Sequence, residues 1–202
     1  MALALLANSL ATGAGLTALI MGLGSISGAH FNPVVTLAEA RTGRRPWSEV
    51  PAYVGAQIFG AFAGVGLAHS MFGQAVFSAS HHPRGGAGQL LSEFIATFGL
   101  LTIIWGCSRS RRDAMPFAVG AYITAAYWFT ASTSFANPAV TLARAGTDSF
   151  TGIRLADASL FVVAQVLGAA AATAFSRWLS PEERSAAAQI AAAHRYERST
   201  KQ

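Results

Sequence analysis

The chain alternates between long apolar segments and short polar or basic loops. A helix needs about 20 apolar residues to cross the ~30 Å hydrocarbon core of a bilayer. Five segments are of about that length, and we predict that they are membrane-spanning helices: residues 2–24, 50–70, 89–107, 114–133 and 155–179. Residues 180–202 mix alanine with charged side chains. We interpret them as a tail outside a single membrane domain of residues 1–179.

A short motif occurs twice, each time directly after an apolar segment. GAHFNPVVTLAEA at residues 28–40 and TSFANPAVTLARA at residues 133–145 align on Asn-Pro. Asn is a favoured N-cap and Pro a favoured first helical residue, so each copy predicts a helix start. A helix over residues 32–40 is roughly 13 Å long, about half of the core. We expect two re-entrant half-helices that enter from opposite faces and meet near the middle of the membrane.

The side chains at these two tips suit a neutral solute. A capping Asn accepts hydrogen bonds from the free N–H groups of its helix, which leaves its NH2 group oriented as a donor. Each helix also points the positive end of its dipole at the same place. We expect Asn32 and Asn137 to present their NH2 groups to one point in a pore, and to oppose cations and protons there. Two ordinary N-capped surface helices are the alternative, which the repetition of the motif disfavours.

Composition agrees with a membrane protein and excludes several other classes. Of the 202 residues, 52% are hydrophobic and 11% charged, far below the ~25% charged of a soluble domain. The net charge of +5 could suggest a nucleic-acid partner, but the arginines lie in short loops between spans. The single cysteine, Cys107, excludes an intrachain disulfide and a cysteine-cluster metal site.

Neither a metal site nor an active site stands out. His81 and His82 are adjacent but have no third ligand nearby in the sequence, so a solvated loop explains them better than a metal pair. We find no nucleophile–base pair or phosphate-binding loop, and Ser92 beside Glu93 is not an active site by itself. We therefore expect no cofactor, no bound metal and no enzymatic activity.

The distribution of basic residues predicts the orientation. Eleven of the fourteen Lys and Arg residues fall on one side if the loops after residues 40 and 107 share a side with the C-terminus. Cytoplasmic loops carry the excess of Lys and Arg. We expect a multi-pass protein of the cell's inner (plasma) membrane with a cytoplasmic C-terminus and with residue 1 outside.

The repetition extends beyond the two motifs. Gln57 and Gly60 in the second span echo Gln165 and Gly168 in the last one, and inverted repeats with broken helices are a transport architecture. Residues 1–70 form the first repeat and residues 89–179 the second. The span that carries Glu93 has no counterpart in the first repeat. We therefore expect the reading frame upstream of Met1 to encode another apolar segment with an early Glu.

These features resemble the major intrinsic protein family, the aquaporins and aquaglyceroporins. The resemblance is carried by HFNPVVT, SFANPAVT and the order of spans around them, and it covers nearly the whole chain. It implies an all-α inverted-repeat bundle, here with five of the family's six spans, and a pore in every subunit of a homotetramer. Water and small neutral solutes would pass between two Asn-Pro boxes: Asn32, Pro33, Val34, Asn137, Pro138 and Ala139. The first box reads Asn-Pro-Val where the family usually has Asn-Pro-Ala.

The resemblance implies a second constriction, the aromatic/arginine filter, toward the outer face. Spacing from the family motifs assigns Thr12, Ser134 and Val140 to it. The fourth position is Ala125 when counted back from Asn137. It is Tyr127 when counted from Gly120, because this segment is about two residues short, and Trp128 is a neighbouring candidate.

Val140 is the main departure from the family pattern, because water-selective and glycerol-selective members usually have Arg there. With Thr12 and Ser134, Val140 predicts a wider, uncharged opening. This resembles bacterial members that pass larger neutral solutes, including trihydroxy metalloids such as arsenous acid.

Two ionisable residues need an explanation: Glu93 lies within the predicted span of residues 89–107, and His30 precedes the first Asn-Pro box. A carboxylate such as Glu93 costs roughly 2.5–3.5 kcal/mol in a span, so it needs a role or a partner. In the family the matching Glu braces the loop of the second half-helix, and we favour that role over a proton relay. His30 either lines the cytoplasmic half of the pore or is a buried structural histidine.

Two functions remain open. The first is a passive channel for small neutral solutes. The second is a non-conducting, truncated or structural member of the channel family, based on the missing span. A coupled carrier is a weaker third interpretation, because Glu93 is the one intramembrane acid that could couple ions.

Overall fold

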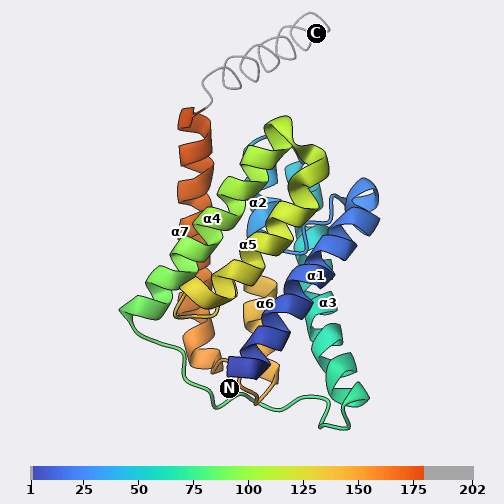
Figure 1. Cartoon of the computed structure of the whole chain (residues 1–202), viewed down its shortest axis with the longest axis vertical. Coiled ribbons are helices and arrows are strands. Elements are labelled where there is room, and N and C mark those ends of the chain that lie inside the picture. Colours follow the sequence, from blue (N-terminus) through green and yellow to red (C-terminus); the bar gives the residue numbers. More distant parts are fainter. Residues whose placement is uncertain (1, 180–202) are drawn as a thin grey trace, which may run out of the picture.

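The computed structural model describes residues 2–179, and the regular elements among them are all helices (Figure 1). Five long helices are α1 (Ala2–Ser27), α3 (Val50–Met71), α4 (Ala87–Ser110), α5 (Met115–Phe129) and α7 (Leu155–Leu179). Two short helices are α2 (Pro33–Arg41) and α6 (Pro138–Ala143). Three 3-10 turns cover Trp47–Glu49, Arg112–Ala114 and Arg144–Gly146. The predicted tail, residues 180–202, lies outside the described residues.

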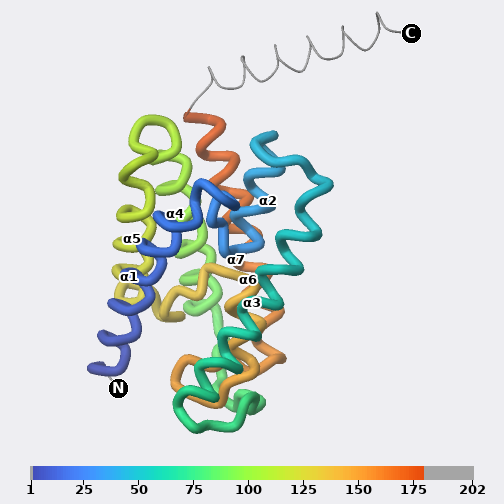
Figure 2. Tube along the Cα trace, turned by 90° about the vertical axis from the view of Figure 1, so that its right-hand side faces the viewer, coloured from blue at the N-terminus to red at the C-terminus, as the bar shows by residue number. Residues whose placement is uncertain are grey.

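The long helices form a bundle around the two short ones. Helix α1 packs along α5 and α4 packs along α7, while α2 and α6 contact each other and both contact α3 and α7. Figure 2 shows α2 and α6 inside the bundle, between α3 and the α1–α4–α5 side. The first residues of α1 and the last of α7 lie at opposite ends of the molecule (Figure 1). This arrangement confirms the predicted all-α bundle with two half-helices.

Four of the described helices are long and apolar enough to cross a membrane: α1, α3 with its preceding turn, α4 and α7. Helix α5 is shorter than the predicted span of residues 114–133. It has 15 residues, about 22 Å of helix, and it ends because Thr130 is extended with φ −109° and ψ 141°. The segment that follows belongs to the loop before α6, so the fourth predicted span, residues 114–133, ends four residues earlier than predicted.

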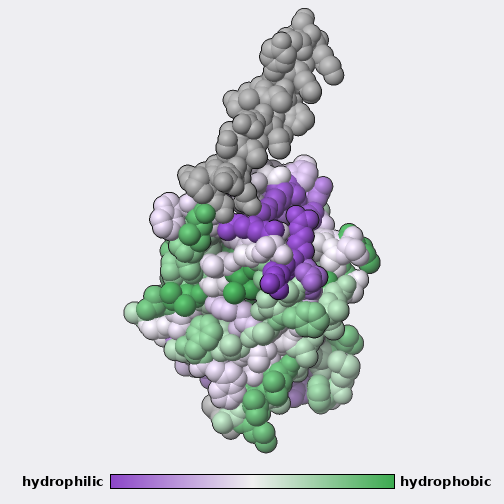
Figure 3. Space-filling view, turned by 45° about the horizontal axis from the view of Figure 1, so that its top comes forward, coloured by the Kyte–Doolittle hydropathy of each residue, from purple (hydrophilic) through white to green (hydrophobic). Residues whose placement is uncertain are grey.

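The sides of the bundle are apolar and one end is basic. Large apolar side chains are exposed on these sides. Leu3 and Phe59, for example, are each 77% exposed. Figure 3 shows hydrophobic side chains along the flank and hydrophilic ones gathered at one end. Helices α2 and α4 finish at this end, and exposed arginines lie in their last turns and in the loops after them: Arg41, Arg44, Arg109, Arg111 and Arg112. An apolar flank with polar ends is what a lipid bilayer requires of a protein that crosses it.

Glycines set the closest helix contacts. A Cβ on Gly13 of α1 would lie 2.8 Å from the carbonyl oxygen of Gly120 on α5, and a Cβ on Gly120 would lie 2.6 Å from that of Gly13. Neither position can carry a side chain without moving the other helix. This crossing fixes the rotation of α5 against α1.

The two repeats differ at one equivalent pair of glycines. A Cβ on Gly168 of α7 would lie 2.4 Å from the carbonyl oxygen of Phe94 on α4. Gly60 holds the equivalent position on α3, and a Cβ there would meet nothing within 4 Å. Gly60 therefore makes no close helix contact among the described residues, because α4 has no counterpart against α3 there.

Candidate functional site

Each half-helix begins at its Asn-Pro pair. Asn32 Oδ1 accepts a hydrogen bond from Val34 N at 3.1 Å. Asn137 Oδ1 accepts from Ala139 N at 3.0 Å and from Val140 N at 3.3 Å. Both asparagines are extended, and the proline after each is the first helical residue. The local sequence is sufficient for this geometry, because Asn satisfies orphan N–H groups and Pro has none to satisfy.

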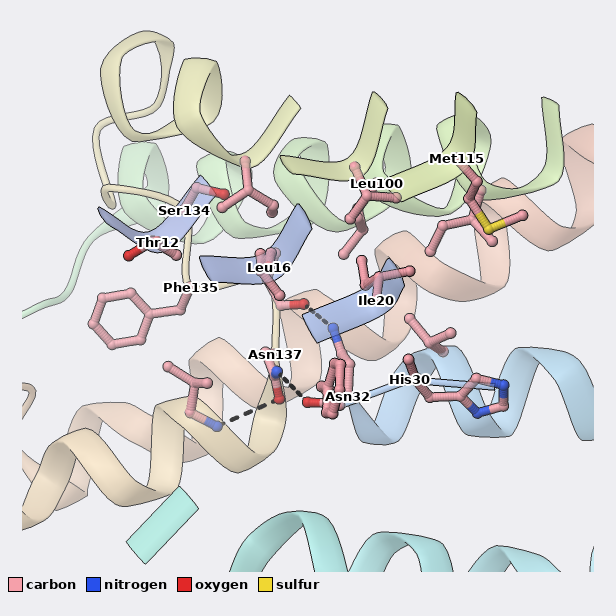
Figure 4. A pocket seen from close by; sticks show the side chains of 18 of the residues that line it. Thr12, Leu16, Ile20, His30, Asn32, Leu100, Met115, Ser134, Phe135 and Asn137 are labelled. Atoms are coloured by element: carbon pink, nitrogen blue, oxygen red, sulfur yellow. Dashed lines mark hydrogen bonds between the residues drawn. The ribbon is translucent and has the colours of Figure 1, made fainter. Parts of the chain in front are cut away.

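The two capping asparagines also donate hydrogen bonds to each other's loops. Asn32 Nδ2 donates to the carbonyl oxygen of Ala136 at 2.7 Å, and Asn137 Nδ2 donates to that of Phe31 at 2.8 Å. Each asparagine thus bonds the residue that precedes the other one, and Figure 4 shows the two tips meeting. An amide NH2 has two hydrogens, so one hydrogen of each group is committed to this contact. The second hydrogen of each is the one that can serve a solute.

The loops before the two boxes repeat the same unusual backbone. Ala29 and Phe31 have φ of 47° and 49°, and their equivalents Ser134 and Ala136 have φ of 50° and 47°. Non-glycine residues in this left-handed region cost of order 1–3 kcal/mol each and persist where the surroundings impose them. The same conformation, imposed at equivalent positions on both sides of the tip contact, indicates a functional constraint on these loops.

The carboxylate of Glu93 accepts hydrogen bonds from the loop that precedes α6. Its Oε1 accepts from Phe135 N at 2.9 Å, and its Oε2 accepts from Ala136 N at 2.8 Å and from Gln165 Nε2 at 2.6 Å. The side chain is fully buried, and Glu93 is not among the residues that line the cavity described next. Its contacts are those of a brace and leave neither oxygen without a donor.

A cavity of about 400 Å³ passes the two tips. The boxes contribute Asn32 and Asn137 near its middle, and the two left-handed loops line it on either side of them (Figure 4). Apolar side chains form much of the remaining wall: Leu16, Ile20, Val35, Leu100, Ile104, Val119 and Ile123. Amide donors set among apolar side chains fix the orientation of a polar solute. Pro33, Val34, Pro138 and Ala139 are buried behind the tips.

Most of the predicted filter residues gather at one end of this cavity. Thr12, Tyr127, Ser134 and Val140 all line it, and Thr12 Oγ1 lies 3.3 Å from Tyr127 OH. Ala125 is exposed on the outer side of α5 and does not line the cavity, so the count from Gly120 places the fourth position better than the count from Asn137.

Trp128, the neighbouring candidate, is also turned away from this end of the cavity. It is 49% exposed and donates its Nε1–H to Ser9 Oγ at 3.1 Å. Its contact is with α1, so we interpret it as part of the α1–α5 packing.

Arg144 is the residue that sequence reasoning missed. It follows α6, one helical turn beyond Val140, and lines the cavity at the Thr12 end. Its Nη2 donates to Tyr127 OH at 2.9 Å. The opening is therefore not uncharged, contrary to the sequence prediction. The aligned motifs contained a signal, because VTLAEA and VTLARA differ only at Glu39 and Arg144.

His30 lines the other half of the cavity, together with Glu39 and Arg45. Its Nδ1 lies 3.0 Å from Thr36 Oγ1, and its ring centroid is 5.8 Å from that of Tyr53. The structure thus brings His30 to the passage and also gives it a fixed hydrogen-bond partner.

His81 and His82 lie in the loop between α3 and α4 and do not line the cavity. His81 N donates to Asp148 Oδ1 at 2.9 Å, and its Nδ1 lies 3.1 Å from Oδ2. These hydrogen bonds, first that of the backbone N–H, lower the pKa of Asp148. No group of three potential metal-ligand side chains occurs within residues 2–179.

A helical bundle with apolar flanks, broken by two half-helices whose tips meet in a cavity, belongs to the class of integral membrane channels. Comparison with known proteins makes the class specific. The family model described as Major intrinsic protein matches residues 1–134 and 112–201. The chain therefore belongs to the major intrinsic protein family, whose members are channels for water and small solutes.

Several members of this family are similar to the chain. Aquaglyceroporin AqpS of Rhizobium meliloti (strain 1021) is 54% identical over 178 residues, which are 88% of this chain and 76% of that protein. Aquaporin NIP1-1 of Oryza sativa subsp. japonica is 41% identical over 116 residues, 54% of this chain and 41% of that protein. Nodulin-26 of Glycine max is 39% identical over 105 residues, 51% of this chain and 39% of that protein. The chain spans less than half of these two plant relatives.

Proposed function

We propose that this protein is a passive channel for water and small neutral solutes, which cross through the cavity between the two Asn-Pro boxes. The observation that carries the proposal is the reciprocal contact of Asn32 and Asn137, which holds both amide groups at the middle of the passage. Each keeps one N–H for a solute oxygen. The dipoles of α2 and α6 direct their positive ends to the same point, which opposes protons and cations.

The small side chains at the Thr12 end favour solutes larger than water. Thr12 and Ser134 are small and carry hydroxyls that donate or accept, and Val140 occupies little of the opening. We propose glycerol-like or arsenous-acid-like molecules as solutes, because they are neutral and carry several hydroxyls. The name aquaglyceroporin, given to the relative from Rhizobium meliloti, supports this solute class.

The transport is proposed to be passive because no acid in the described residues is available to couple it. Both oxygens of Glu93 accept hydrogen bonds from fixed donors. Glu39, which lines the cavity, lies 3.8 Å from Arg44 Nη1. The contacts of both carboxylates fit structural roles and not the binding and release of a driving ion.

We place the protein in the plasma membrane with its C-terminus in the cytoplasm. The exposed arginines after α2 and α4 support that orientation, because they gather at the end of the bundle where α7 finishes (Figure 1). A homotetramer with one pore per subunit is the proposed assembly, and the apolar flanks of α1 and α3 provide surface for lipid and for neighbouring subunits.

The uncovered face of α3 favours one alternative, a non-conducting member of the family. Gly60 and Gly64 face no neighbour among the described residues. A bundle that leaves this face of α3 uncovered would not enclose a sealed pore.

Stopped-flow assays on purified protein in liposomes separate these possibilities. We expect faster water, glycerol and arsenous acid permeation than in empty liposomes. We expect the double variant Asn32→Leu, Asn137→Leu to lose permeation of all three solutes. The double variant keeps the volume of the tips and removes their donors and caps, so its folding is checked by gel filtration. Permeation by the parent equal to that of empty liposomes supports the non-conducting alternative.

A further inference from the structure

Arg144 has a guanidinium with unused hydrogen-bonding capacity. Its Nη2 donates to Tyr127 OH, and its Cζ lies 4.2 Å from the centroid of the Phe135 ring. Its Nη1 is buried and has no hydrogen-bond partner among the described residues. Arg144 also forms no ion pair within residues 2–179. A guanidinium stays protonated in proteins, so this is a fixed positive charge on the wall of the passage.

The other nearby arginine is fully engaged. Arg84 is 6% exposed, and its guanidinium donates to the carbonyl oxygens of Gly152 at 2.7 Å, Ser132 at 2.9 Å and Phe150 at 3.0 Å. Burial is the main cause that lowers the pKa of Arg84 to about 10, and repulsion from Arg144 is the second cause. Arg84 does not line the cavity. Its role is to tie the loops together, which leaves Arg144 as the cation that a solute would meet at the Thr12 end of the cavity.

The opposite end of the cavity differs in charge. Glu39 and Arg144 both lie seven residues after the Asn of their box, and both line the cavity. Glu39 has Arg44 close to it at 3.8 Å, and Arg45 is paired with Glu49. At that end the charges compensate one another, whereas at the Thr12 end the positive charge of Arg144 is not compensated.

A second polar atom at the Thr12 end also lacks a partner. Ser134 Oγ is buried without a hydrogen bond among the described residues, and Ser134 lines the cavity. Buried polar groups in native proteins are almost always satisfied by protein, water or ligand. Arg144 and Tyr127 are hydrogen-bonded to each other, and Ser134 lines the same cavity, so a solute with several hydroxyls would meet polar side chains from all three residues.

We propose that Arg144 is a specificity-determining residue of the pore: from one helical turn beyond Val140, it repels cations and donates a hydrogen bond to hydroxylated neutral solutes. This inference rests on the proposed channel function. Val140 is a prerequisite, because its short side chain leaves the space through which the guanidinium of Arg144 reaches Tyr127. The donor set then selects for hydroxyl groups, while the fixed charge excludes cations of similar size.

The test compares Arg144→Met with Arg144→Lys in liposomes, using methylammonium as the cation and glycerol as the neutral solute. Removing a fixed charge beside a narrow passage lowers the barrier to a cation by at least about a factor of ten in rate. We expect Arg144→Met to pass methylammonium at least about tenfold faster than the parent and to lose preference for glycerol over water. We expect Arg144→Lys to exclude methylammonium as the parent does. Arg154→Met, at an exposed arginine outside the cavity lining, is the matched control.

The experiment distinguishes a failure of the proposed channel function from a failure of the proposed role of Arg144. A parent protein that passes neither water nor glycerol overturns the proposed function itself. A conducting parent together with an Arg144→Met variant that still excludes methylammonium overturns the role of Arg144 alone. If Arg144→Met does not fold, Arg144→Cys in a Cys107→Ser background replaces it. A cationic thiol reagent, added after reconstitution, should then restore exclusion of methylammonium, and a neutral reagent should not. Equal effects of the two reagents would contradict the proposal.

Discussion

The side chain of Gln165 donates a hydrogen bond to Glu93, with Nε2 and Oε2 2.6 Å apart. The contact joins α7 to α4 behind the second half-helix, and the same Nε2 lies 2.8 Å from Thr141 Oγ1 on α6. In the first repeat, Gln57 Nε2 donates to Thr36 Oγ1 at 2.9 Å, which matches the second of these bonds. The buried carboxylate belongs to the second repeat alone within the described residues.

Glu93→Gln should destabilise the protein. A Gln offers one acceptor oxygen and an NH2 group to three donors, so at least one buried donor loses its partner at a cost of roughly 1–3 kcal/mol. We expect a lower unfolding temperature in detergent and slower solute permeation, because the loop before α6 loosens. Glu49→Gln is the control, since the Glu49 side chain is 48% exposed in its ion pair with Arg45. An unchanged unfolding temperature in Glu93→Gln would contradict the role of a brace.

Gly168→Ala and Gly60→Ala form a matched pair across the two repeats. The methyl group at residue 168 would press on the backbone of Phe94, and overpacking of this kind costs roughly 1–3 kcal/mol. At residue 60 the methyl group meets no atom of the described chain, and replacing a helical Gly by Ala stabilises by up to about 1 kcal/mol. Thermal unfolding of each variant measures the difference. Equal destabilisation by both would mean that another helix or subunit covers α3 in the assembled protein.

Val140→Arg should reduce permeation of glycerol and arsenous acid by more than it reduces permeation of water. The added side chain fills space that the larger solute needs, and it places a second cation one turn from Arg144, where like charges repel. Val140→Met is the matched variant, because it adds length without charge and separates volume from repulsion. Stopped-flow rates for the three solutes give the comparison. Equal fractional losses for water and for the larger solutes would refute the steric argument.

The loop contact of Asp148 should make stability depend on pH. Hydrogen bonds from His81 lower the pKa of Asp148 in the folded protein. The stabilisation is therefore complete above the unfolded pKa of about 3.9, and it is lost as the pH falls through the lower folded value. We expect Asp148→Asn to unfold at a slightly lower temperature than the parent at pH 6, because exposed contacts contribute little.

That difference should shrink as the pH falls below about 3.9, the unfolded value. The exposed Asp113, between α4 and α5, supplies the control Asp113→Asn. A difference between parent and Asp148→Asn that persists undiminished at the lowest pH would rule out the ionised carboxylate as its source.

The amino-acid sequence was sufficient for the elements and for the tips. The apolar segments predicted the bundle, and the Asn-Pro pairs predicted where α2 and α6 begin, because capping depends on two adjacent residues. A buried carboxylate at Glu93 was also evident from the sequence, since it stands within an apolar segment. These are local properties, and each can be evaluated within a few residues of the chain.

The tertiary structure decided which side chains face the passage. Each helical residue turns about 100°, so a two-residue shift moves a side chain to another face. The choice between Ala125 and Tyr127 therefore depended on the contact of Gly120 with Gly13, more than 100 residues away in sequence. Arg144 joined the cavity because Tyr127 and Phe135, from other segments, receive its guanidinium. Such contacts are fixed by the packing of whole helices, which no local pattern specifies.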